Sequence, residues 1–210
     1  MTLRQLELSI GGVILHGDLG LPPEPRGLVI FAHGSGSGRH SPRNQAVARV
    51  LEDAGCATLL SDLLADEEEG RRDLVFDIAL LTDRLVEITH RAAREPDVAG
   101  LPVGYFGAST GAAAALRGAA GIGATVRAVV SRGGRPDLAA DRLDAVTAPT
   151  LLIVGGADPE VLALNRDAAS RLRCRHRIEV VPGAGHLFAE EGALERVAAL
   201  ARDWFTAYLA

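Results

Sequence analysis

Lysine is absent from this chain of 210 residues, so all 22 of its basic side chains are arginines. A protein without lysine cannot use a Schiff-base lysine, a pyridoxal phosphate anchor or the lysine of a P-loop. Cysteine is scarce as well: Cys56 and Cys174 are far apart, which excludes a disulfide framework and a C-x-x-C motif for zinc or redox chemistry. Aromatic residues make up 4% of the chain, so we expect no stacking cage for a large planar substrate.

Excess positive charge and long apolar runs are also missing. The 27 acidic side chains outnumber the 22 arginines, and a formal net charge of −5 offers no basic surface for nucleic acid or anionic lipid. No stretch approaches the roughly 20 apolar residues of a membrane span, and the start of the chain does not resemble a signal peptide. We therefore expect a cytoplasmic protein with neither nucleic-acid nor membrane partners. Composition and length predict one globular domain over residues 1–210.

Strand-like and helical segments alternate along most of the chain. Strands are predicted at 3–10, 13–18, 27–32, 56–60, 101–106, 126–130, 150–154 and 177–181. Helices are predicted at 42–54, 71–94, 112–120, 138–145, 160–172 and 193–209, and the acidic run 66–69 is expected on a solvated loop or helix start. This alternation predicts an α/β fold, with a mostly parallel sheet and helices on both faces.

The sharpest chemical signal is Gly107-Ala108-Ser109-Thr110-Gly111, which matches the pattern G-x-S-x-G. It follows a predicted strand and precedes a predicted helix, as a nucleophile turn must. Glycine is needed there because side chains at 107 and 111 would collide with neighbouring backbone. The turn would hold Ser109 in a strained conformation above the sheet, at the positive end of the following helix. We interpret Ser109 as a catalytic nucleophile; the alternative is a glycine-rich turn with a solvated serine.

A serine nucleophile needs a base and a group that orients the base. Among the six histidines, His186 lies on the loop after the last predicted strand, at the same sheet edge as Ser109. Asp158 follows the strand 150–154, and the order Ser, Asp, His favours it over the rivals Asp62 and Asp137. Asp158 also suits the N-cap of the next helix, and the two roles are compatible.

An oxyanion hole requires two backbone N–H groups beside the nucleophile. Thr110 is expected to supply one, and Ser35, or alternatively Gly36, the other. Both loop residues lie in His33-Gly-Ser-Gly-Ser-Gly38, which lacks the third glycine of a dinucleotide fingerprint and the lysine of a Walker loop. His33 is expected to hold this loop in place rather than to take part in the reaction.

Ser109, Asp158, His186 and the His33-Gly34 loop together resemble the α/β-hydrolase superfamily, and within it small dienelactone-hydrolase-like proteins. The stretches 34–44 and 131–137 are similar to a bacterial branch in which some members are fused to a phosphoribosyltransferase domain; these 210 residues hold no such domain. The resemblance implies an eight-stranded sheet with an antiparallel second strand. True dienelactone hydrolases use a cysteine nucleophile, so serine at position 109 favours a general esterase.

The segment 131–149, where the superfamily inserts its lids, is too short for a cap domain. We therefore predict an open site that hydrolyses carboxylic esters, or thioesters or lactones, through an acyl-enzyme without metal or cofactor. Arg39 and Arg132 are candidate ligands for a substrate carboxylate, with Arg43 and Arg135 nearby; the alternative is solvated arginines paired with surface acids. The other functions considered are a catalytically silent binding protein and an acyltransferase or perhydrolase using the same three residues. The sequence leaves the oligomeric state open.

Overall fold

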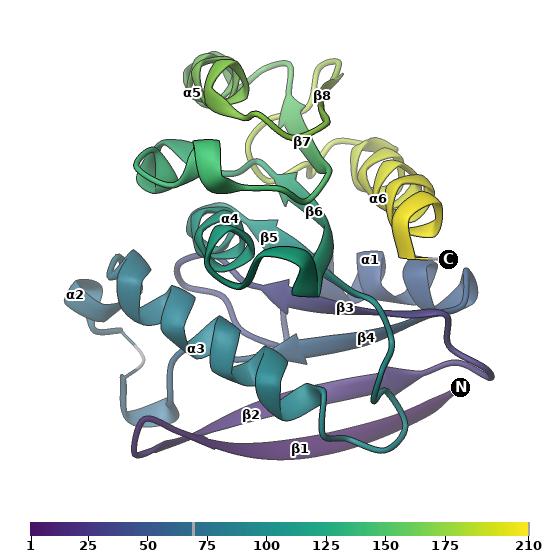
Figure 1. Cartoon of the computed structure of the whole chain (residues 1–210). Helices are drawn as coiled ribbons and strands as arrows, with labels where there is room; N and C mark the ends of the chain where they lie inside the picture. The colour runs from purple at the N-terminus through teal and green to yellow at the C-terminus, as the bar shows by residue number, and fades with distance from the viewer. Residues whose placement is uncertain (69, 210) are drawn as a thin grey trace.

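A computed structural model describes residues 1–68 and 70–209. Within them, eight strands form one sheet in the order β1-β2-β4-β3-β5-β6-β7-β8 (Figure 1). Their bounds are β1 Thr2–Ile10, β2 Val13–Leu21, β3 Gly27–Ala32, β4 Cys56–Ser61, β5 Val103–Ala108, β6 Val126–Arg132, β7 Thr150–Gly155 and β8 His176–Val181. Strand β2 is antiparallel to β1 and β4, whereas the pairings from β4 through β3 to β8 are parallel. The predicted mostly parallel sheet is confirmed.

Helices cover both faces of the sheet (Figure 1). One face carries α3 (Ile78–Ala92), α4 (Thr110–Ile122) and α5 (Pro159–Arg171), and the other carries α1 (Pro42–Asp53) and α6 (Ala193–Leu209). The short helix α2 (Arg72–Val75) precedes α3. Each face has its own buried apolar cluster, because successive side chains of a strand point to opposite sides. Tyr105 joins the α3/α4 cluster, and the next residue, Phe106, joins the α1/α6 cluster.

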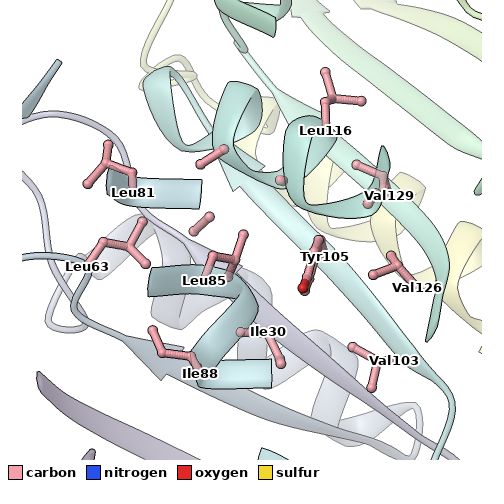
Figure 2. Packing of buried hydrophobic residues seen from close by; sticks show 14 of the residues in the cluster. Ile30, Leu63, Leu81, Leu85, Ile88, Val103, Tyr105, Leu116, Val126 and Val129 are labelled. Atoms are coloured by element: carbon pink, nitrogen blue, oxygen red, sulfur yellow. The ribbon is translucent and has the colours of Figure 1, made fainter. Parts of the chain in front are cut away.

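The α3/α4 cluster fixes the strand that leads to Ser109. Figure 2 shows Tyr105 of β5 among aliphatic side chains from α3, α4 and the neighbouring strands. Its hydroxyl is fully buried and donates to Thr89 Oγ1 at 2.6 Å, since Thr89 donates in turn to the Leu85 carbonyl. Burial raises the pKa of Tyr105, so the phenol stays neutral. Because the buried Tyr105 hydroxyl has its hydrogen-bond partner only in this position, the bond favours a single register of β5.

The prediction of one continuous helix over residues 71–94 is wrong. The structure divides it into α2 and α3, and the Asp77 side chain caps α3 by accepting from Leu80 N at 3.0 Å. An aspartate that caps the second helix competes with helical continuation of the first. As a result Phe76 is turned outward and stays 50% exposed.

Two smaller predictions had different outcomes. The expected helix 138–145 is a pair of 3-10 turns, Pro136–Ala139 and Leu143–Ala145, because neither has a side-chain cap that would favour a longer helix. The acidic run lies at a helix start as expected: Asp66 and Glu67 are exposed in the 3-10 turn Asp66–Glu68, whereas Glu68 is partly buried, in an ion pair with Arg84. Glu69 lies outside the described residues. Between β6 and β7 the described chain holds only these turns and no separate cap domain. In the described residues no helix is both long and apolar enough to cross a membrane.

Candidate active site

Ser109 occupies the turn between β5 and α4, with φ of 51° and ψ of −121°. A positive φ is costly for a residue with a side chain, and it persists only where the surroundings enforce it. Three backbone hydrogen bonds do so here. Ser109 N donates to the Arg132 carbonyl at 3.2 Å, and Ser109 O accepts from Ala112 N and Arg135 N, each at 3.1 Å. The side chain makes no cap bond to its own helix and is partly exposed, so the hydroxyl is accessible.

The glycines that flank Ser109 are required by close backbone approach. A Cβ on Gly107 would lie 2.4 Å from Ala112 Cα, and one on Gly111 would lie 2.1 Å from the Ala32 carbonyl oxygen. Neither contact is possible without moving main chain. The predicted reason for the G-x-S-x-G spacing is therefore confirmed: α4 starts directly against the end of β3 and leaves no room for side chains.

Asp158 and His186 come together at the same sheet edge. His186 Nδ1 donates to Asp158 Oδ2 at 2.8 Å, which leaves Nε2 as the free, accepting nitrogen of the imidazole. The other Asp158 oxygen accepts from Val161 N at 3.4 Å, so this residue also caps α5. The rival carboxylates are paired elsewhere: Asp62 with Arg39, and Asp137 with Arg135.

The His186 ring lies close to the backbone next to Ser109. An ideal Cβ on Gly133 would be 3.7 Å from His186 Cε1, and Gly133 follows Arg132, whose carbonyl accepts from Ser109 N. Across residues 1–68 and 70–209, no hydrogen bond joins the Ser109 hydroxyl to His186. The structure thus forms the Asp158–His186 link and brings the imidazole to the neighbouring strand end. Hydrogen bonds to a nucleophile are commonly long in free enzymes and shorten with substrate bound.

The glycine-rich loop after β3 lies against Ser109. A Cβ on Gly34 would come within 2.9 Å of Ser109 Cβ, which shows how closely the loop passes by Ser109. Ser35 N donates to Thr110 Oγ1 at 3.1 Å, so this predicted oxyanion donor is held by the Thr110 side chain. His33 Nε2 accepts from Leu63 N at 2.9 Å and its Nδ1 lies 3.0 Å from the Gly34 carbonyl. His33 anchors the loop, as predicted.

A cavity of about 560 Å³ opens beside Thr110, between the glycine-rich loop and the α2–α3 region. Its apolar wall consists of Leu64, Val75, Phe76 and Leu81. Arg72 and Asp62 supply polar groups. This wall could not be predicted from one continuous helix over 71–94, because Val75 and Phe76 line the cavity only where the chain breaks between α2 and α3. Asp77, a capping residue inside the helical pattern, is the signal in the sequence for that break. No group of His, Cys, Asp and Glu side chains in the described chain could hold a metal ion.

The two candidate substrate-binding arginines differ. Arg39 is ion-paired with Asp62 and lies 3.9 Å from Asp18, so its charge is compensated within the protein. Arg132 is 9% exposed, and its Nε and Nη1 atoms are buried without a partner. Burial and, to a smaller extent, the nearby charge of Arg43 together lower the pKa of Arg132 to about 10.

A family model described as the dienelactone hydrolase family matches residues 15–209. The chain belongs to the dienelactone hydrolase family. The crystal structure of a dienelactone hydrolase from Anabaena variabilis is 54% identical, covers 100% of this chain and 99% of its own, and superposes with a TM-score of 0.97. With this match the α/β-hydrolase fold is confirmed.

More distant members of the fold align almost as fully. Est1E from Butyrivibrio proteoclasticus covers 97% of this dienelactone hydrolase family member at 16% identity, with a TM-score of 0.83, which shows the shared fold alone. A Mycobacterium tuberculosis protein provisionally named a phosphoribosyl transferase is 58% identical over 206 residues. The chain covers 46% of that protein, so the name describes a polypeptide about twice as long.

Proposed function

We propose that this dienelactone hydrolase family member is a serine hydrolase that cleaves carboxylic esters through an acyl-enzyme on Ser109. The observation that carries the proposal is the strained Ser109 backbone at the start of α4, on the same sheet edge as the hydrogen-bonded Asp158–His186 pair. Strain at one serine, beside an imidazole whose tautomer is fixed by a carboxylate, is the arrangement that nucleophilic acyl transfer needs.

In the proposed reaction His186 Nε2 accepts the Ser109 proton while Ser109 Oγ bonds to the ester carbonyl carbon. Asp158 holds the proton on Nδ1 and stabilises the imidazolium that forms. His186 then passes its proton to the departing alcohol, and the acyl group stays on Ser109. A water molecule, deprotonated by the same imidazole, attacks the acyl carbon and releases the carboxylic acid with Ser109 restored.

The developing oxyanion is expected to accept from Thr110 N–H, the first backbone donor of α4. The second donor comes from the glycine-rich loop: Ser35 N–H, shared with Thr110 Oγ1, or Gly36 N–H, the alternative left open by the sequence. The cavity beside Thr110 is the natural place for the acyl group, because its wall of leucine, valine and phenylalanine side chains suits an apolar chain.

Replacing Ser109 tests the proposal. Ser109→Ala removes the attacking oxygen and should lower kcat for short p-nitrophenyl esters by about 10⁴-fold or more, because the remaining groups cannot form an acyl-enzyme. Ser9→Ala, at an exposed position of β1, is the matched control and should keep full activity. Equal rates in Ser109→Ala and the wild type would refute the assignment. A wild type inactive on ester, thioester and lactone panels would favour the silent binding protein, and acyl products on added amines or peroxide would favour a transferase.

A further inference from the structure

Arg132 and Arg43 end two rows of apolar side chains at the catalytic edge of the sheet. Val130 of β6 lies in the α1/α6 cluster, and Arg132, two residues on, points to the same side of the strand. Val47 of α1 lies in that cluster too, and Arg43 is one helical turn before it. Both guanidinium groups therefore extend the same apolar layer toward the rim, and the charge of Arg43 is close enough to lower the pKa of Arg132.

The buried charge of this pair is not compensated. Arg132 Nε and Nη1 and Arg43 Nε are buried without a hydrogen-bond partner, and no ion pair joins either arginine to a carboxylate within residues 1–68 and 70–209. The first turn of α1 has no acidic residue either. Arg132 is buried and Arg43 is half-buried. Two like charges whose buried nitrogens lack hydrogen-bond acceptors are unfavourable, and a bound anion would relieve that cost.

The Arg43–Arg132 pair lies next to Ser109. The Arg132 carbonyl accepts from Ser109 N at 3.2 Å, and the following residue, Gly133, lies against His186. Arg43 is half-buried, so the pair reaches the surface through α1. The α1 N-terminus adds a favourable dipole end for an anion, and guanidinium groups match oxoanions with two parallel hydrogen bonds. The apolar cavity lies on the other side, toward α2 and α3.

We propose that Arg43 and Arg132 form an oxoanion-binding site beside Ser109, which holds a carboxylate or phosphate group carried by the substrate. The assignment to the substrate rests on the proposed function, whereas oxoanion binding itself does not. The natural ester would then be anionic, with its charged group on the α1 side of Ser109 and its apolar part in the cavity beside Thr110. Arg39 has no part in this site, because Asp62 and Asp18 already compensate it.

Inorganic phosphate tests the site without any catalysis. Titration calorimetry on the wild type and on Ser109→Ala should give the same phosphate affinity. Arg132→Met should weaken that affinity at least tenfold, Arg43→Met should weaken it as well, and Arg132→Lys should restore part of it. The matched control is Arg49→Met, an exposed arginine on the same helix, which should bind phosphate as the wild type does. Absence of phosphate binding in the wild type, or wild-type affinity in folded Arg132→Met and Arg43→Met, would overturn the site.

A second experiment, a kinetic comparison of two esters, tests whether the site binds an anionic group of the substrate or only free phosphate. The monoester of succinic acid with p-nitrophenol carries a carboxylate, and p-nitrophenyl butyrate is its neutral counterpart. Arg132→Met should lower kcat/KM for the anionic ester at least tenfold relative to the neutral one. Phosphate binding with an unchanged ratio would keep the anion site and overturn its assignment to substrate. Inactivity of the wild type on both esters would refute the proposed function, while the phosphate titration would still decide the site.

Discussion

Two buried arginines on opposite faces of the sheet show how differently one side chain can be accommodated. Arg84 of α3 is 6% exposed and Arg132 at the end of β6 is 9% exposed. Arg84 donates to Glu68 through both terminal nitrogens, at 2.6 and 2.8 Å, and to the Leu63 carbonyl at 2.9 Å. Arg132 has two buried nitrogens without any partner.

The presence or absence of hydrogen-bond partners indicates the role of each arginine. A buried cation with a bidentate carboxylate is part of the structure, since it ties α3 to the segment before α2. A buried cation without a partner is a cost to the fold, and a protein tolerates such a cost most readily where a ligand supplies the missing group. On the α3 side the buried arginine is therefore paired within the fold, whereas on the α1 side the buried nitrogens of Arg132 have no acceptors in the described chain, which is the basis of the anion site proposed above.

Removing the paired arginine should have the largest effect on stability. Arg84→Met leaves the Glu68 carboxylate without its counterion and should lower the free energy of unfolding by about 3 kcal/mol at pH 7, measured by urea denaturation. Arg84 holds the pKa of Glu68 below its ordinary value of 4.5. The pair therefore contributes fully above that value, and the gap between wild type and variant should narrow as the pH falls through the lowered pKa. A gap independent of pH would contradict a role through Glu68.

Removing the unpaired arginine should have a smaller effect of the opposite sign. Arg132→Met keeps the apolar part of the side chain and deletes an uncompensated charge. In buffer without oxoanions its free energy of unfolding should therefore equal that of the wild type or exceed it by up to about 2 kcal/mol. The pKa of Arg132 is lowered to about 10, so the cost of its charge is present below that pH and is relieved as the pH rises past it. The stability difference should accordingly shrink above pH 10. A marked loss of stability in Arg132→Met at pH 7 would mean that Arg132 is structurally paired after all.

Much of the fold could be predicted because its signals are local. Continuous apolar runs such as 27–32 and 150–154 indicate strands covered on both faces. Gly107 is required by contacts within its own strand–turn–helix unit, whereas Gly111 is required by the neighbouring end of β3. The break at Phe76–Asp77 was missed because helical periodicity continues across it, and only the capping bond of Asp77 interrupts the helix. The 3-10 turns after Pro136 were missed for a related reason, since short apolar spacings fit both kinds of turn.

The candidate site likewise has features that the sequence predicted and features that it did not. The chain order of serine, aspartate and histidine at strand ends was enough to place Asp158 beside His186, because the carboxyl ends of parallel strands share one edge. Neither the ion-pair partners of Arg39 nor the lack of acceptors for the buried nitrogens of Arg132 could be predicted. Asp62 lies 23 residues after Arg39 and reaches it only through strand pairing, and nothing in the sequence around Arg132 indicates that its guanidinium nitrogens are left without acceptors.

Covalent labelling tests the central claim, an activated nucleophile at Ser109, most directly. The wild type would be treated with a fluorophosphonate, digested and mapped by mass spectrometry, with His186→Ala and Ser109→Ala in parallel. The account predicts one phosphonylated residue, Ser109, with labelling at least 100-fold slower in His186→Ala and absent in Ser109→Ala. A folded wild type that stays unlabelled, or that is labelled at another serine, would contradict it.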